Sequence, residues 1–443
     1  MISRSLLCLA GLTWLIAINF SYGSDNQPPE GFIALFTGND LSGWFGYDTK
    51  DPRKFQALSE EEQQAIRDKS QDDIKQHWSV QNGELVNDGH GLYLTTSKNF
   101  GDYELWVDYK TVPKADSGIY LKGTPQVQIW DPTNEAEFKN GSDKGSGGLW
   151  NNKAGQPGKF PLVLADKPFG EWNSFHIVQI GARTTVYLNE KLVVDSAIMG
   201  SFYDGGELPL IPRGPIQLQT HGGEIRWKNI FLREIPVDEA RALLQKRDLQ
   251  EGFISLFNGN DLTGWENAVD NYEVVDGSIR CKAGKGGVLH TKDEYTDFAA
   301  RLEIKIPAGG NNGLAIRYPG QGDTAYVGMC ELQVLDNEDA RYAKLDKRQY
   351  HGSAYGMAPG ARGYLRPAGD WNYQEVTVVG STIKVELNGN LILDTDLSKI
   401  TEYMANSPHP GKDRTKGFFG FAGHGDPVEF RNIRIKSLVT ESK

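Results

Sequence analysis

Two His-Gly pairs, at His221 and His424, are the positions in this sequence best suited to acid–base chemistry. Each histidine stands at the end of a predicted strand, and the glycine after it would let a ligand approach the ring. An imidazole titrates near neutral pH, so it can serve as a general base or as a metal ligand. A histidine can also cap its own turn. Here, however, the pair recurs, and an arginine follows in both places, at Arg226 and Arg431. The recurrence favours a functional role.

A predicted strand in each half of the chain carries polar side chains on one face and aliphatic ones on the other. In QVQIWD and ELQVLD, alternation places the first and third residues together, and an aspartate ends each strand. Such a face can line a binding cleft, or it can be an ordinary solvent-facing side of a sheet. The polar positions are Gln126, Gln128 and Asp131 in the first half and Glu331, Gln333 and Asp336 in the second.

Aromatic and amide side chains gather in the loop before a Trp-Asn strand in each half. A ring face can stack on a sugar while amides pair with its hydroxyl groups, so this composition suits carbohydrate recognition. The residues are Trp150 and Asn151 in the first half and Tyr350, His351 and Tyr355 in the second.

The elements that must position these residues come from one domain present twice. Residues 31–44 read GFIALFTGNDLSGW, residues 252–265 read GFISLFNGNDLTGW, and later landmarks recur in the same order. Short segments of alternating polarity, separated by Gly, Asn and Asp, predict all-β domains. The expected fold is two tandem β-sandwiches of the jelly-roll kind.

Two helices interrupt this pattern. One is predicted in an insertion at about residues 46–76 of the first copy, where Ser59 and Glu62 form a capping box, and its polarity indicates a solvated surface helix. The other is a linker, and because it is short and charged we expect the two domains to fold separately. The chain divides into a first domain, residues 24–236, a linker helix, residues 237–250, and a second domain, residues 251–443.

The N-terminus and the charge balance bear on location and partners. Residues 1–23 combine a basic start, an apolar run and a small-residue exit, which predicts a cleaved secretory signal and a secreted or periplasmic protein. An uncleaved anchor is the alternative, and nothing after residue 24 is apolar for long enough to cross a bilayer. A net charge of −11 argues against a nucleic-acid partner. Cys281 and Cys330 could form a disulfide or remain separate buried thiols.

The motifs of several enzyme classes are absent from the sequence. It contains no metalloprotease helix, phosphate loop, dinucleotide fingerprint or nucleophile elbow. An ordinary glycosidase needs two carboxylates that flank the scissile bond. The duplicated framework retains one, at Asp131 and Asp336.

Taken together, the repeated motifs resemble the 3-keto-disaccharide hydrolase domain family. They are the opening GF-I-x-LF-x-GNDL-x-GW, the strand (E/Q)-x-Q-(I/V)-x-D, the EWN or DWN turn, the V-x-LN hairpin and the closing HG with (W/F)-(K/R)-N-I. The resemblance covers both copies. It implies a concanavalin-like jelly roll and a secreted or periplasmic enzyme that acts on glycosides whose ring C3 is a ketone, by hydrolysis or by elimination.

The chemistry of such a substrate gives roles to the candidate residues of the second copy. A ketone at C3 acidifies the proton on C2, and a base that removes it can expel the C1 substituent by β-elimination, after which water can add back. The site needs a base, a cation near the C3 oxygen and an acid near the leaving oxygen. A divalent metal could polarise the ketone, although the sequence identifies no metal. The candidates are His424 or Glu331 as base, Arg431 or Arg317 as oxyanion partner, and Asp336 or His351 as acid or metal ligand.

The first copy departs from this set. It has Gln126 in place of Glu331, Lys122 in place of Arg317, and no histidine corresponding to His351. The second copy is therefore the favoured active site.

Two alternatives remain for the first copy, and two competing functions remain for the whole protein. The first copy either uses another set around His221, Gln128 and Asp131 or binds without cleaving. The competing functions for the protein are a carbohydrate-binding protein with two lectin-like modules and an envelope protein that binds other proteins through its sandwich faces. A base beside an oxyanion partner would distinguish an enzyme from a binder.

Overall fold

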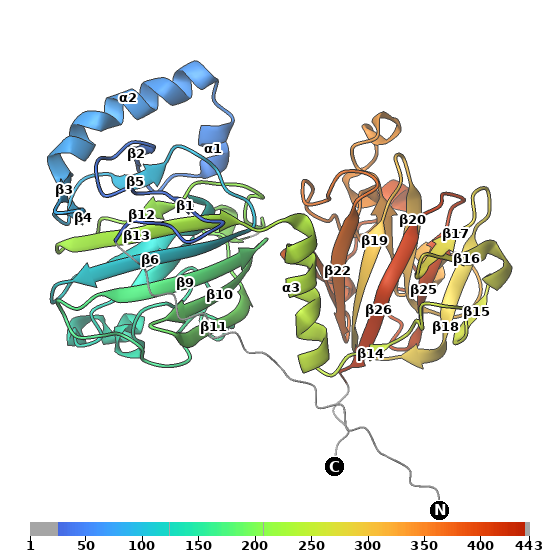
Figure 1. Ribbon diagram of the computed structural model, residues 1–443. Coiled ribbons are helices and arrows are strands. Elements are labelled where there is room, and N and C mark those ends of the chain that lie inside the picture. Colours follow the sequence, from blue (N-terminus) through green and yellow to red (C-terminus); the bar gives the residue numbers. More distant parts are fainter. Residues whose placement is uncertain (1–24, 124, 207, 439–443) are drawn as a thin grey trace, which may run out of the picture.

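The computed structural model describes residues 25–123, 125–206 and 208–438 of the protein. The predicted secretory signal, residues 1–23, lies outside the described residues. Two β-sandwich domains stand side by side with a helix between them (Figure 1). In the described part of the chain, each domain packs a larger antiparallel sheet against a smaller one. This confirms the predicted pair of all-β sandwich domains.

The larger sheets have the same strand order in both domains. In the first domain the order is β11 (Lys191–Ile198), β10 (Arg183–Leu188), β9 (Asn173–Ile180), β6 (Tyr103–Thr111), β13 (Ile225–Glu234), β4 (Glu84–Asn87) and β3 (Trp78–Gln81), with β1 (Ile33–Ala34) on β13. In the second it is β24 (Asn390–Asp396), β23 (Thr382–Leu387), β22 (Trp371–Val379), β19 (Phe298–Lys305), β26 (Glu429–Ser437), β17 (Ser278–Cys281) and β16 (Tyr272–Val275), with β14 (Ile254–Ser255) on β26.

The smaller sheets correspond in the same way. The first domain has the order β2 (Trp44–Tyr47), β5 (Tyr93–Thr96), β12 (Gln217–Leu218), β7 (Ser117–Tyr120) and β8 (Gln126–Ile129). The second has β15 (Trp265–Asn267), β18 (Gly287–Tyr295), β25 (Gly417–Gly423), β20 (Asn311–Tyr318) and β21 (Cys330–Leu335). The repeat in the sequence is thus a repeat of topology.

Alternation along the strands sets which side chains enter the core. Leu314 of β20 and Leu332 of β21 are buried in the core of the second sandwich, so their neighbours Gly313 and Glu331 point the other way. We call this second side, which faces away from the core, the outer face of the smaller sheet.

The repeated opening motif anchors the start of each domain. The buried Trp44 donates its indole N–H to the carbonyl oxygen of Leu35 at 2.6 Å, and Trp265 donates to that of Leu256 at 3.0 Å. A buried indole needs such an acceptor, which explains why the tryptophan recurs at a fixed distance from the first strand.

The insertion of the first domain forms α1 (Pro52–Gln56) and α2 (Glu60–His77), so the expected bounds of 46–76 were only approximate. The predicted capping box is present, with Glu62 N–H donating to Ser59 Oγ at 3.2 Å and Ser59 N–H donating to Glu62 Oε2 at 2.9 Å. The helix is not solvated on all sides. Ile74 is buried in the first core, and α2 covers the β2 side of the smaller sheet (Figure 1).

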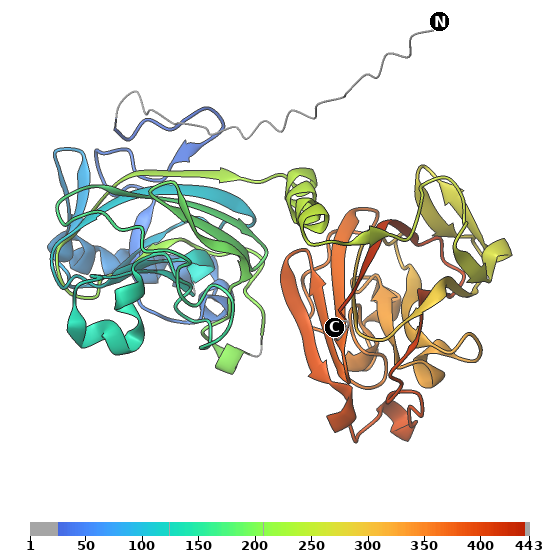
Figure 2. The same cartoon turned by 90° about the horizontal axis from the view of Figure 1, so that it is seen from below.

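Helix α3 (Val237–Gln250) occupies the predicted linker, but it belongs to the domain interface and is not a free spacer (Figure 1 and Figure 2). Ala240 and Leu244, one turn apart, pack with Ile180 and Ile235 of the first domain and with Tyr373 of the second. That the two domains fold separately stays a prediction. This apolar pair gives the helix a buried face.

Ion pairs strengthen the same interface. Arg241 of α3 pairs with Glu303 of β19, which is fully buried and also accepts from Arg431 Nε at 2.5 Å. Arg183 of β10 contacts Glu386 of β23 through two N–O distances of 2.5 Å. The two sandwiches are therefore joined by buried charges as well as by the helix.

Cys281 and Cys330 are both buried and remain separate thiols. Of the alternatives for these residues, the structure shows unpaired core cysteines. Within the described ranges, no helix is both long enough and apolar enough to cross a membrane.

Candidate functional site

The outer face of the smaller sheet in the second domain brings Glu331 and His424 together. Glu331 lies on β21 and His424 directly follows β25, with β20 between these strands. His424 Nε2 lies 3.1 Å from Glu331 Oε1. The side chain of Glu331 is 5% exposed and that of His424 is 45% exposed. A buried carboxylate thus orients a ring that a ligand can reach.

Gly313 on β20 makes this contact possible. A Cβ atom at this position would fall 2.3 Å from Glu331 Oε1. The glutamate side chain therefore crosses β20 at a point where no side chain stands, and this brings its carboxylate to the histidine.

We expect Gly313→Ala to lower kcat/KM by about 10²-fold, because the methyl group would displace the carboxylate, and misplacement by about 1 Å has effects of this size. Gly313 does not have a positive φ, so its backbone accepts alanine. Gly200→Ala is the control, since its Cβ would lie 3.3 Å from Asn152 Oδ1, which needs to move by only a few tenths of an ångström. Full activity of Gly313→Ala, measured beside its melting temperature, would show that the contact is not needed.

Small residues form the floor beside the pair. Ala315 on β20 is in register with Glu331 on one side and with Gly420 of β25 on the other. Ala422 is in register with Gly313 in the next row. Ala315 and Ala422 are buried in a small apolar cluster with Val288 and Tyr318.

Glu331 raises the pKa of His424 above its ordinary value, mainly through their hydrogen bond. Burial acts in the opposite direction, while the charges of Glu331, Asp323 and Asp426 add to the rise. The ring therefore holds a proton more firmly than a free imidazole does.

The first domain also has a His–carboxylate pair on its outer face, but the carboxylate is Asp116. His221 Nδ1 lies 2.7 Å from Asp116 Oδ2, and Gln128 Nε2 donates to Asp116 Oδ1 at 2.6 Å. Gln126 in turn donates its amide N–H to Gln128 Oε1. The hydrogen bond that Asp116 accepts from His221 is the main cause of the raised pKa of His221.

Asp116 was not among the predicted site residues, because the second copy has asparagine at this position and the two copies therefore share no carboxylate there. The pairing of Gly118 with Gln128 and of Gly313 with Gln333 shows that Asp116 corresponds to Asn311. Aligning the copies through Asp-Ser-Gly and Asn-Asn-Gly would have found this second carboxylate.

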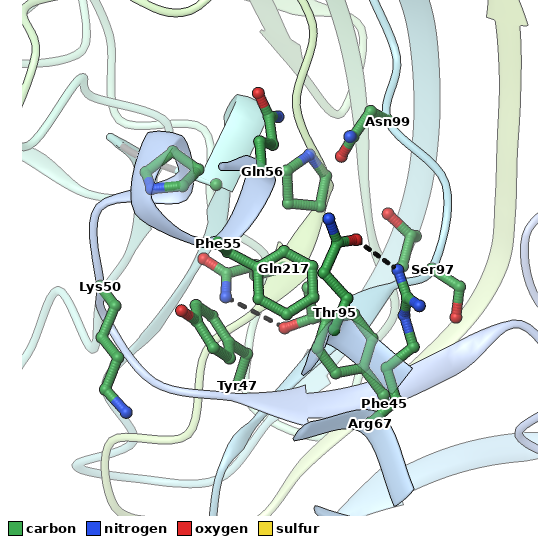
Figure 3. Close-up of a pocket in the computed structure, with 15 residues that line it drawn as sticks. Phe45, Tyr47, Lys50, Phe55, Gln56, Arg67, Thr95, Ser97, Asn99 and Gln217 are labelled. Atoms are coloured by element: carbon green, nitrogen blue, oxygen red, sulfur yellow. Dashed lines mark hydrogen bonds between the residues drawn. The ribbon is translucent and has the colours of Figure 1, made fainter. Parts of the chain in front are cut away.

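Large side chains fill the outer face of the first domain. Tyr120, Gln217 and Gln219 stand where the second domain has alanine and glycine. A cavity of about 30 Å³ remains beneath the insertion (Figure 3). This volume holds roughly two water molecules, far less than the ~300 Å³ of a small ligand pocket. Its lining includes Phe45, Tyr47, Phe55, Arg67, Thr95 and Gln217.

Arg431 and Arg226 do not lie beside the histidines, so their assignment as oxyanion or substrate partners is wrong. Arg431 lies on β26 of the larger sheet, where it binds Glu303 and its guanidinium carbon is 3.9 Å from the ring centroid of Trp371. Arg226 lies on β13 and donates to Glu84 Oε2 at 2.9 Å. Between each histidine and its arginine the chain crosses from one sheet to the other, which separates residues that are close in sequence.

Arg317 and Lys122 are buried structural cations. Arg317 Nη1 donates to the carbonyl oxygen of Gly380 at 2.7 Å, and Lys122 Nζ donates to that of Gly181 at 2.8 Å. Burial lowers the pKa of Lys122 to about 8. Each cation holds the turn after β22 or β9, so neither one is available as the predicted oxyanion partner.

Asp336 and Asp131 hold backbone turns instead of acting as acids. Asp336 accepts from the Gly309 N–H at 2.8 Å, and Asp131 accepts from the Lys114 N–H at 2.7 Å. His351 is 1% exposed, and its Nε2 lies 2.9 Å from Gln374 Oε1. Burial lowers the pKa of His351 to about 4, so it is a neutral core residue and not the predicted acid or metal ligand.

Among the predicted aromatic and amide residues, Tyr355 is the one next to the pair. Its backbone N–H donates to the carbonyl oxygen of Glu331 at 2.9 Å. The others are held within the protein. Tyr350 donates to Tyr342 O at 2.9 Å, and Trp150 packs edge-on against Trp130. Asn151 Oδ1 accepts from Gln126 N–H at 3.2 Å. Gln333 donates to Asn311 Oδ1 at 2.7 Å.

In the described part of the chain, no three side chains among His, Cys, Asp and Glu are grouped so that they could hold a metal ion. The residues considered as metal ligands, His351 and Asp336, are engaged as described above.

Comparison with known proteins finds the same family twice along the chain. Residues 31–233 and 252–436 each match the 3-keto-alpha-glucoside-1,2-lyase-like domain. A Bacteroides thetaiotaomicron protein named 3-keto-disaccharide hydrolase is 28% identical over 231 residues, covering 42% of this chain and 79% of that protein. A crystal structure of a candidate glycosyl hydrolase from Parabacteroides distasonis is 28% identical, covers 42% of this chain and 100% of its own, and gives a TM-score of 0.39. A carbohydrate-binding module from Bacillus subtilis is 15% identical, covers 40% of this chain and 96% of its own, and gives 0.27.

Proposed function

The chain belongs to the family of 3-keto-alpha-glucoside-1,2-lyase-like domains, whose members act on glycosides, and we propose that it cleaves glycosides whose ring C3 is a ketone. The observation that carries this proposal is the Glu331–His424 pair beside a floor of alanine and glycine. A ring that is exposed to a ligand and held by a buried carboxylate is suited to removal of the C2 proton.

In the proposed reaction His424 is the base and Glu331 positions it. Glu331 binds the proton on Nε2, which leaves the lone pair on Nδ1 to take the proton from C2. The electrons of that C–H bond form an enolate with the C3 ketone, and collapse of the enolate expels the C1 oxygen substituent. The carboxylate stabilises the imidazolium that forms, in the way a triad aspartate does.

This role predicts how activity depends on pH. Because the base must be unprotonated, kcat/KM should rise with pH through the raised pKa of His424. In Glu331→Gln, made in a chain that also carries Asp116→Asn, the main cause of the raised pKa of His424 is removed, so the remaining activity should rise at lower pH. Profiles of kcat/KM against pH check both statements, and a flat profile for the wild type would contradict the assignment.

The proposal is tested with a chromogenic 3-keto-glucoside beside its unoxidised parent. We expect release of the aglycone from the oxidised sugar alone, because the parent has no acidified C2 proton. Deuterium at C2 should slow the reaction if elimination occurs and leave direct hydrolysis unaffected. Equal turnover of both sugars would overturn the proposal, and binding without turnover would favour a lectin-like protein.

We also propose that the protein works outside the cytoplasm. The basic start and apolar run of residues 1–23 support this location. Fractionation of cells that express the full chain would test it.

A further inference from the structure

We propose that the first domain holds a second acid–base centre, built from Asp116 and His221, in which the carboxylate has moved to a neighbouring strand. This inference rests on the proposed function and concerns the copy that lacks a counterpart of Glu331. Its basis is a one-for-one exchange of acid and amide between the two outer faces.

The register of the strands defines the exchange. The β7–β8 pair of the first domain and the β20–β21 pair of the second align glycine with glutamine, Gly118 with Gln128 and Gly313 with Gln333. The first domain then has Asp116 before β7 and Gln126 at the start of β8. At the corresponding positions the second domain has Asn311 and Glu331. Each face keeps one carboxylate beside its histidine.

Buried glutamines hold the first pair in place. Gln126 and Gln128 are 3% and 2% exposed, and they form a chain of hydrogen bonds that ends on Asp116 Oδ1. The other oxygen of Asp116 is thereby turned towards His221. The His77–Asp88 pair of the same domain differs: its contact is 3.0 Å, and its aspartate is 50% exposed. In the Asp116–His221 pair the aspartate is 24% exposed and the histidine is 59% exposed, so the carboxylate is the more buried partner and the ring is open to solvent.

The two histidines use opposite ring nitrogens. His424 binds its carboxylate through Nε2 and keeps Nδ1 for a substrate, whereas His221 binds through Nδ1 and keeps Nε2. In an imidazole, Nε2 lies farther from the backbone than Nδ1 does. A base that reaches farther from the sheet suits the outer face of the first domain, where the larger side chains of Tyr120, Gln217 and Gln219 project from the strands.

These features predict a substrate of the same class that is bound higher above the sheet. It would lose its C2 proton to His221 Nε2, form the enolate and expel its C1 substituent, as in the second domain. Because such a substrate contacts less of the face, we expect a higher KM at this centre.

The test uses the full chain and the chromogenic 3-keto-glucoside. Glu331→Gln should keep a residual activity with a raised KM. Adding Asp116→Asn should lower the remaining kcat by about 10²-fold or more. Adding Asp88→Asn instead, which disrupts the His77–Asp88 contact of the same domain, should leave the remaining kcat unchanged. Adding His221→Gln should reproduce the effect of Asp116→Asn, which guards against misfolding of a single variant.

Failure of the second centre can be told apart from failure of the proposed function. No activity in Glu331→Gln beside an active wild type would overturn the second centre and leave the proposed function standing. Residual activity insensitive to both Asp116→Asn and His221→Gln would also overturn it. An inactive wild type would instead reject the proposed function itself, and the second centre with it.

Discussion

Replacing Glu331 by glutamine, in a chain that also carries Asp116→Asn, is expected to lower kcat/KM on a 3-keto-glucoside by about 10²–10⁴-fold. The first substitution removes the charge that orients His424 and stabilises its protonated form. The fold should be kept, because Gln126 occupies the corresponding position of the first domain and lies above the corresponding glycine, Gly118.

Two comparisons sharpen this expectation. Glu273→Gln removes a carboxylate of the same domain that is 36% exposed and paired with Arg280, and it should leave kcat/KM unchanged. His424→Gln should lose as much activity as Glu331→Gln, and the two together should lose little more, since groups that act as a unit are not additive. Near-normal turnover in either single variant would place the base elsewhere.

Replacing Glu303 by glutamine is expected to lower the free energy of unfolding by about 3–5 kcal/mol, as when one partner of a buried ion pair is removed. Glu303 is 0% exposed and accepts from Arg431 Nε at 2.5 Å and from Gln245 Nε2 at 2.6 Å, besides its pairing with Arg241. Glutamine would remove the counter-ion of Arg431 and would leave Arg241 paired with the exposed Asp238 alone, at the junction of α3 and β19. Denaturant unfolding of the full chain measures the loss.

Glu239→Gln provides the matched control for this substitution. Glu239 also lies on α3 and pairs with Arg233, but it is 39% exposed. Exposed pairs contribute about 1 kcal/mol or less. Equal losses in the two variants would mean that the buried charges do not fasten the domains together.

Local patterns in the sequence predicted the fold well. The repeated Gly-Trp motif, the alternating strands, the capping box at Ser59 and the helix over residues 237–250 depend on neighbours in the chain, and they lie where the sequence placed them. The interface role of α3 was not predicted, because the partners of Ala240 and Leu244 lie far along the chain.

The site was harder to predict because a sandwich has two sheets whose strands look alike in sequence. The interpretation paired His424 with Arg431, yet the strand carrying the arginine belongs to the larger sheet. It treated His351 as chemically active because burial cannot be read from a loop sequence. The contact between His424 and Glu331 joins residues 93 positions apart, and only the strand order brings them together.

The exchange of acid and amide between the outer faces also constrains how the two copies diverged. Asp and Asn codons differ by a single nucleotide, as do Glu and Gln codons, yet moving the charge takes both changes. The intermediate therefore carried both carboxylates or neither. With neither, the histidine would lose its orienting partner. With both, two anions would flank the imidazolium and favour its protonated form, so a doubly acidic ancestor is the more viable route. Asn311→Asp rebuilds that state in the second domain, and it should fold with a further rise in the pKa of His424. Loss of the fold, or an unchanged histidine titration by NMR, would argue for a different order of events.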